Sequence, residues 1–235
     1  MSWESRLSLR FISLRRVQSR RLLLVRYACL LSIGLFCYGC SSPGPVRTGY
    51  QGAELTRDGE AGEVVPESVR QSYDTALQAM LSDDITEAEL ALETMVLEYP
   101  DYAGPYANLA ILYLEDGRDA EARVALDAAL SVNPDHAESN NQLGILLRKE
   151  GRFIEAEKAY RRAIQANAKY SLAHYNLGVL LDLYLHRPAE ALDHYEAYQA
   201  LLAEPDTKVA RWIVDLRRRV AAGDGEARVA QGDGA

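Results

Sequence analysis

Cysteine is scarce in this sequence, and the few cysteines lie near its beginning. All three, Cys29, Cys37 and Cys40, fall within the first 40 of 235 residues. If the chain is cleaved before Cys40, the remaining protein carries one cysteine, at its first position, and can form no internal disulfide. Its fold must then be held together by packing alone.

The sequence also lacks an apolar run of membrane-spanning length. The apolar run from Tyr27 to Gly39 has 13 residues, none of them charged, whereas a spanning helix needs about 20. The segment before this run contains seven arginines and one acid, Glu4. A basic segment, a short apolar core and small residues at its end are typical of a secretory signal peptide. The alternative is a retained single-pass anchor with its arginines in the cytoplasm.

Positive charge is scarce beyond residue 39. Residues 40–235 contain 19 basic and 33 acidic side chains, which gives a net charge of −14. Such a surface repels nucleic acid and anionic lipid head groups. We therefore expect no nucleic-acid partner, and we expect that any membrane attachment depends on the N-terminal segment.

Recognisable catalytic and metal-binding motifs are missing as well. The sequence contains no G-x-S-x-G, G-x-x-x-x-G-K-[ST] or H-E-x-x-H pattern. Its four histidines form no His-x-x-x-His pair, and none lies beside a cysteine, whereas a zinc site needs three or four converging ligands. We expect no metal, no cofactor and no catalysis. An envelope enzyme that uses the fold as a platform is the alternative.

The sequence does contain a period of 34 residues. Residues 103–136 align without gaps with residues 137–170, and further copies occupy 69–102 and 171–204. Small residues recur at two positions, which predicts two helices per copy that cross closely. They are Ala76, Ala110, Gly144 and Gly178 at repeat position 8, and Ala88, Ala122 and Ala156 at position 20.

The residues between the expected helices favour turns. Gly117 and Gly151 suit a tight turn, because a positive φ is cheap only for glycine. The first copy has no glycine there, and Asp84 is expected to cap its second helix. The fourth copy carries one extra residue in its turn, in the stretch "LYLHRPAEA".

These four copies resemble the tetratricopeptide repeat (TPR) family over residues 69 to about 204. The resemblance implies an all-α solenoid of about four helix-turn-helix repeats, occupying residues 67–204. A capping helix is expected at 205–222, because Val209, Trp212, Ile213, Leu216 and Val220 lie on one helical face. Residues 40–66 are expected to be a flexible tether and residues 223–235 a disordered tail.

In TPR arrays the first helices of the repeats line a concave groove that binds a protein or peptide segment. By this resemblance, repeat position 9 lies on the groove floor, and it is apolar in every copy: Leu77, Ile111, Ile145 and Val179. The other expected groove residues are Tyr73, Met80, Leu114, Glu115, Asn141, Arg148, Lys149, Tyr175 and Asp182. An apolar floor with charged edges suits an amphipathic helix or an extended segment. The alternative is that position 9 belongs to the core.

The pair Gly39-Cys40 resembles the end of a bacterial lipoprotein signal peptide, which here would be residues 1–39. The resemblance implies that Cys40 is acylated and holds the protein to a membrane, and Ser41 after it resembles lipoproteins of the outer membrane. The expected protein is a periplasmic TPR scaffold that assembles or holds an envelope machine, such as a pilus or secretion, peptidoglycan or TonB-type complex. A location at the inner membrane, or a single-pass inner-membrane protein, is the alternative.

Overall fold

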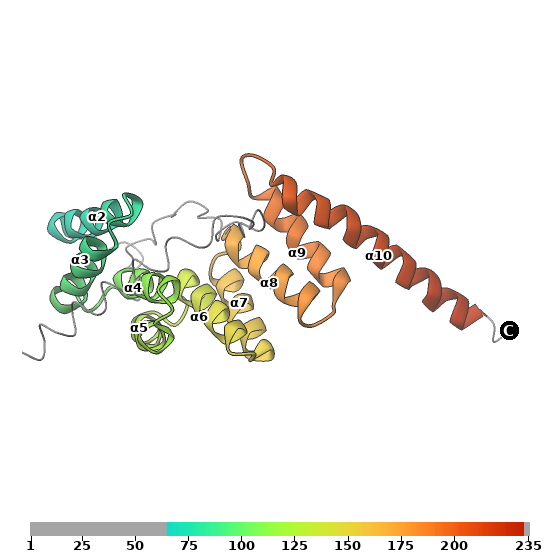
Figure 1. Cartoon of the computed structure of the whole chain (residues 1–235), viewed down its shortest axis with the longest axis horizontal. Helices are drawn as coiled ribbons and strands as arrows, with labels where there is room; N and C mark the ends of the chain where they lie inside the picture. The colour runs from blue at the N-terminus through green and yellow to red at the C-terminus, as the bar shows by residue number, and fades with distance from the viewer. Residues whose placement is uncertain (1–64, 233–235) are drawn as a thin grey trace, which may run out of the picture. The chain divides into compact units, whose positions relative to one another are not determined.

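The computed structural model describes residues 65–232, with side chains up to residue 222. Over this range the chain forms α-helices and no β-strand, as Figure 1 shows. The expected signal peptide, the lipidation site Cys40 and most of the expected tether lie outside the described residues. No helix in the described range has both the length and the apolar character of a bilayer-crossing segment.

The helices of the repeat region form four successive pairs. These are α2 (Glu67–Leu81) with α3 (Ile85–Glu98), α4 (Ala103–Glu115) with α5 (Asp119–Val132), α6 (Ala137–Lys149) with α7 (Phe153–Ala166), and α8 (Ser171–Leu183) with α9 (Pro188–Ala200). Each helix packs against its partner and against the next pair, and the first helices α4, α6 and α8 also contact one another in turn. The structure confirms the predicted all-α solenoid of four repeats.

The two helices of each later pair cross where a glycine meets a tyrosine. A Cβ atom on Gly144 would lie 2.6 Å from Cδ1 of Tyr160, and one on Gly178 would lie 2.8 Å from Cε1 of Tyr195. Both rings are buried, and van der Waals contact requires more than 3 Å. Each ring therefore occupies the space that a methyl group at the glycine would need.

The first two repeats have different residues at the same helix crossing. Ala76 and Ala110 replace the glycines, and Leu92 and Leu126 stand where the later repeats have tyrosine. All four of these side chains are fully buried. A larger residue on the first helix thus accompanies a smaller one on the second, which keeps the volume at the crossing similar.

The buried side chains of the array form two main clusters that meet at α6. The N-terminal core comprises residues of the first two repeats and Leu146, and the C-terminal core begins at Leu147 and continues through the last two repeats to Leu216 in the final helix. Consecutive residues of one helix therefore belong to different cores.

The turns inside the repeats follow the expected chemistry in three cases. Gly117 and Gly151 have φ values of 77° and 76°. In the first repeat the Asp84 side chain accepts a hydrogen bond of 3.2 Å from the backbone N–H of Glu87, which confirms the predicted cap. A residue other than glycine takes the positive φ in two turns, Asp83 at 63° in the first and His186 at 52° in the fourth.

The final helix, α10 (Thr207–Gly232), packs on α9. The Asp206 side chain caps it by accepting hydrogen bonds from the backbone N–H groups of Lys208, at 2.8 Å, and Val209, at 3.1 Å. Val209, Ile213 and Leu216 are buried, as the predicted apolar face requires.

Helix α10 extends further than the sequence indicated. We expected it to end at residue 222 and the tail from residue 223 to be disordered, but the helix continues to Gly232. Between Gly225 and Gly232 the tail contains five residues that favour helix, Glu226, Ala227, Arg228, Ala230 and Gln231. An isolated glycine inside a helix costs only about 1 kcal/mol, so the glycines at 223 and 225 do not end it.

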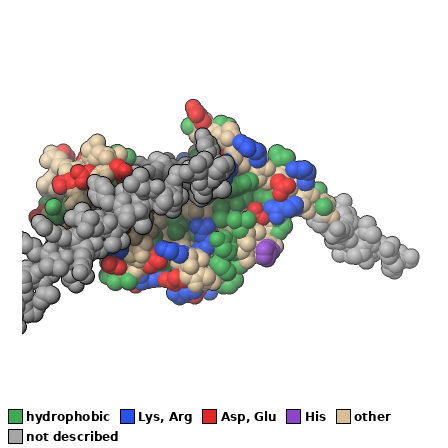
Figure 2. All heavy atoms as spheres, in the orientation of Figure 1, with side chains coloured by type: hydrophobic (Ala, Val, Ile, Leu, Met, Phe, Trp, Pro, Cys, Tyr) green, Lys and Arg blue, Asp and Glu red, His purple; other side chains and the backbone are tan. Residues whose placement is uncertain are grey.

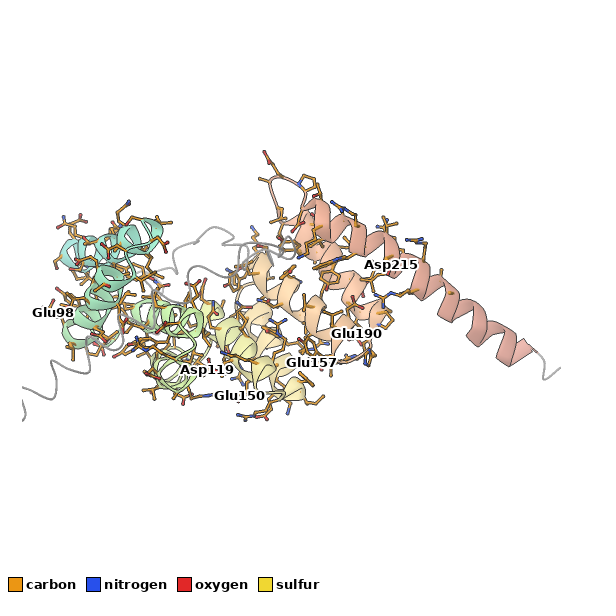
Figure 3. All side chains as sticks on the ribbon, viewed as in Figure 1. Glu98, Asp119, Glu150, Glu157, Glu190 and Asp215 are labelled. Carbon is orange, nitrogen blue, oxygen red and sulfur yellow. The ribbon has the colours of Figure 1, made fainter. Side chains whose placement is uncertain are left out.

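Ion pairs join neighbouring repeats along the second helices. Arg118 donates to Glu89 at 2.7 Å and Arg187 to Glu157 at 2.8 Å, each bond linking one repeat to the one before it. At the junction between the second and third repeats, Arg123 stands at the repeat position that Glu89 and Glu157 occupy in their repeats. It donates to Glu150 at 2.8 Å. Figure 3 labels Glu150 and Glu157 in this row.

Candidate protein-binding surface

The predicted groove floor is partly buried and partly open. Leu77, Ile111 and Ile145 are half-buried, and Val179 is buried. Leu77 packs against the N-terminal core and Ile145 against the C-terminal core. Position 9 therefore contributes to the packing between repeats and, in three of the four copies, keeps some side-chain surface open.

Three other expected groove residues are buried between repeats instead. Tyr73 is 2% exposed, Met80 is 3% exposed and Asn141 is 1% exposed. The amide of Asn108 donates to the hydroxyl oxygen of Tyr73 at 2.7 Å, and the amide of Asn176 donates to the side-chain oxygen of Asn141 at 2.9 Å. Repeat position 5 thus faces position 6 of the next repeat, and its polar atoms are used there.

Two of the expected charged groove residues form ion pairs within the domain. The carboxylate of Asp182 on α8 accepts a bond of 2.7 Å from Arg219 on α10, so it helps to hold the final helix. Lys149 donates to Asp119 at 2.7 Å, and Figure 3 labels Asp119. In the free protein, neither charge is an unpaired group at the edge of the groove.

An aromatic cluster joins the fourth repeat to the final helix. The Tyr175 ring stacks on Trp212 with centroids 6.2 Å apart and lies 5.2 Å from the ring of Tyr198. The ammonium group of Lys208 lies 4.9 Å from the centre of the Trp212 ring. Burial and the nearby carboxylate of Asp206 raise the pKa of Tyr175. The sequence indicated Tyr175 as a groove residue and Trp212 as a capping residue, and the structure brings them together.

The remaining expected residues lie at or near the surface. Ile111, Leu114 and Arg148 are half-buried, and Glu115 is exposed. The guanidinium carbon of Arg148 lies 6.0 Å from the centre of the Tyr184 ring. Ile111, Leu114, Ile145, Arg148 and Tyr175 therefore provide a mixed apolar and cationic surface on the first helices.

The structure also reveals a histidine pair that the sequence analysis missed. Nδ1 of His174 on α8 lies 3.1 Å from Nδ1 of His194 on α9. Burial and the neighbouring His174 lower the pKa of His194 to about 4. The two residues are far apart in sequence, so a search for spacing within one helix could not find them. In the described part of the chain, no group of three or more potential metal ligands comes together.

Comparison with known proteins identifies the repeats. Two family models, both described as tetratricopeptide repeat, match residues 79–141 and 141–204. Both models describe this repeat and neither describes a catalytic domain. No curated protein sequence matches the chain.

Solved structures share the fold. The pilF structure from Pseudomonas aeruginosa has a TM-score of 0.58 and 24% sequence identity, over 72% of this chain and 78% of that one. TTC0263, a thermophilic TPR protein of Thermus thermophilus, has a TM-score of 0.51 and 24% identity, over 67% and 81%. MamA of Desulfovibrio magneticus RS-1 has a TM-score of 0.53 and 17% identity, over 70% and 92%. The chain is therefore a tetratricopeptide repeat protein, with the helical scaffold that such proteins use to bind other proteins.

Proposed function

We propose that this protein is a lipid-anchored scaffold on the periplasmic side of the outer membrane, which binds a segment of a partner protein along the first helices of its repeats. The short apolar run that ends at Gly39-Cys40 supports the lipid anchor. The four-repeat array supports the binding role, since such solenoids provide extended binding surfaces.

The observation that carries the binding role is the open surface at position 9. Ile111 and Ile145 are one repeat apart on α4 and α6, and both keep part of their side chains at the surface. Because their spacing repeats with the array, an amphipathic helix or extended segment can contact both at once.

The binding role is tested with the double variant Ile111→Ser and Ile145→Ser. Fully burying an isoleucine contributes about 1.5 to 3 kcal/mol, so partner recovery from envelope extract should fall strongly. Ile145 also packs on the C-terminal core, so circular dichroism must show that the variant stays folded. The control is Val124→Ser, because Val124 is an exposed aliphatic residue on α5. A folded double variant that recovers its partner at the wild-type level would contradict the role.

The lipid anchor is tested with Cys40→Ala. The wild type should incorporate radioactive palmitate, and the variant should remain an unlabelled, unprocessed precursor. A single-pass inner-membrane protein would incorporate no lipid and would show no change in length on this substitution. Fractionation of the membranes then separates an outer-membrane from an inner-membrane location.

The partner complexes that suit such a scaffold are pilus or secretion machines, peptidoglycan enzymes and TonB-type energising complexes. Crosslinking in intact cells, followed by mass spectrometry of the captured proteins, distinguishes these three. Capture of cytoplasmic proteins alone would contradict a periplasmic role.

A further inference from the structure

The turn between α8 and α9 differs from the other turns inside the repeats. Its four residues, 184–187, replace the three residues found in each of the other repeats. His186 in this turn adopts a φ of 52°, and the residues with a positive φ in the other three turns are Asp83, Gly117 and Gly151. A positive φ at a residue other than glycine is uncommon and costs energy. The three shorter turns show that joining the two helices does not require the extra residue.

Apolar side chains gather beside this turn. Leu183 is 61% exposed, Tyr184 is 42% exposed and Ile154 is 59% exposed. The Phe153 ring lies with its centroid 4.8 Å from that of Tyr184, which connects the start of α7 to the end of α8. Figure 2 shows hydrophobic side chains gathered at this end of α7 and α8.

The corresponding positions of the second repeat are mostly acidic. Where Leu183 and Tyr184 stand in the fourth repeat, the second has Glu115 and Asp116, and where Phe153 stands in the third, the second has Asp119. Apolar residues at these positions are therefore not a requirement of the fold. Contiguous exposed apolar residues are typical of interaction sites.

An arginine without an acidic partner adjoins the same aromatic ring. Arg148 is half-buried, its guanidinium lies over Tyr184, and no carboxylate of the described residues lies within 4 Å of it. The other described cations without such a partner are exposed: Lys158, Arg162, Lys169, Lys208 and Arg211. A partly desolvated charge is costly unless it is paired, so Arg148 favours a carboxylate from outside the chain.

The charges around Arg148 already have partners. Lys149 pairs with Asp119, Glu150 accepts from Arg123, and Asp182 accepts from Arg219. Arg148 is thus a cation with open hydrogen-bond donors on a protein whose net charge is −8. Residues 67–136 carry 3 basic and 15 acidic side chains, whereas residues 137–222, which include Arg148, carry 13 basic and 11 acidic. The first two repeats would therefore repel an acidic segment and the C-terminal half would not, which favours binding at Arg148.

We propose that the turn-edge patch, formed by Arg148, Phe153, Ile154, Leu183 and Tyr184, binds a protein segment in which an Asp or Glu carboxylate stands beside a large apolar side chain. The carboxylate pairs with the planar guanidinium of Arg148, and the apolar side chain covers Leu183 and Ile154. This inference rests on the proposed partner-binding function and names the chemistry of the segment that is bound.

The test uses the full chain in detergent and a library of random peptides displayed on phage. Enriched peptides should place Asp or Glu next to Leu, Phe, Tyr or Trp. One enriched peptide and its Glu→Gln counterpart are then synthesised, and their affinities are measured by fluorescence anisotropy. Because a hydrogen bond to a charged group contributes about 1.5–3 kcal/mol, Arg148→Gln should weaken the acidic peptide about tenfold to a hundredfold. The same variant should leave the Glu→Gln peptide unchanged.

Matched variants separate this site from the rest of the surface. Leu183→Ser should weaken the peptide, whereas Val124→Ser, an exposed aliphatic residue on α5, should not. Arg162→Gln removes an exposed cation and should also have no effect. Arg148→Lys, which keeps the charge but loses the planar fork, should bind with intermediate affinity. Circular dichroism verifies that each variant is folded.

Two outcomes overturn the proposal in different ways. If peptides bind with unchanged affinity to Arg148→Gln and Leu183→Ser but lose affinity for Ile111→Ser with Ile145→Ser, the turn-edge patch is not the site and the proposed binding function stands. If no peptide is enriched over the empty support, both proposals fail.

Discussion

Replacing Gly144 by alanine should change stability in opposite directions in two backgrounds. In an exposed helix this substitution stabilises by about 1 kcal/mol, because glycine disfavours helix. At Gly144 the new methyl group would overlap the fully buried ring of Tyr160. Overpacking of this kind typically costs about 1–3 kcal/mol, so the wild-type background should lose up to about 2 kcal/mol.

The Tyr160→Leu background removes the ring and with it the overlap. Gly144→Ala combined with Tyr160→Leu would give this crossing the same two residue types as the preceding repeat, where Ala110 meets Leu126. In this background Gly144→Ala should stabilise, by up to about 1 kcal/mol from helix propensity. The difference between the two backgrounds, about 1–3 kcal/mol, is the coupling free energy of a double-mutant cycle.

Thermal and urea unfolding of the four proteins, followed by circular dichroism, measures this coupling. For a domain of this size, 1 kcal/mol corresponds to a change in Tm of about 2–4 °C. The control is Gly151→Ala, whose Cβ meets no atom within 4 Å but whose positive φ disfavours alanine, so it should destabilise equally in both backgrounds. If Gly144→Ala has the same effect with and without Tyr160, the ring does not fill the crossing and the reasoning is wrong.

Three further predictions concern the rest of the array. Trp212→Ala should lower the free energy of unfolding by about 1–3 kcal/mol. This is less than the 3–5 kcal/mol typical of a fully buried tryptophan, because Trp212 is half-buried. An unchanged Tm would show that α10 does not seal the array. Stability should fall by about 1–2 kcal/mol, after allowance for solvent screening, as the pH drops from about 6.5 to 4, because the folded state binds the His194 proton less readily than the unfolded state does. His194→Gln should flatten this slope in pH-dependent urea titrations, whereas the exposed His186→Gln should not. Tyr160→Phe should leave Tm unchanged or raised, since no group of the described residues bonds the buried Tyr160 hydroxyl; a clear loss of stability would refute this.

The sequence was sufficient to predict the repeats because their signals are local. Glycines at 117 and 151 mark turns, and small residues at positions 8 and 20 mark helix crossings. The extent of α10 was harder to predict, because Gly223 and Gly225 are individually unfavourable in a helix and their effect depends on the surrounding alanines. Whether the helix continues depends on the sum of the helix propensities over the whole segment.

The binding surface was less predictable, because burial there depends on the neighbouring repeat. Tyr73 and Asn141 both stand at position 5, and each is buried because position 6 of the next repeat provides an asparagine that bonds it. Tyr175 stands at the same position but meets Trp212 of the final helix. A family pattern assigns one role to all three, whereas the actual contacts come from residues 29 to 37 positions away in the chain.

Because the two cores meet at α6, the joint between the second and third repeats should determine how the array responds to tension. The asparagine bonds reinforce the joints between the first two repeats and between the last two, but Ala107 has no polar atom to offer to the third repeat. This middle joint also carries two ion pairs, Arg123 with Glu150 and Lys149 with Asp119, and salt screens such pairs near the surface. Under tension at high ionic strength, the array should therefore extend first at the middle joint while both halves stay intact. It would act as a short spring made of two stiff segments and one compliant link.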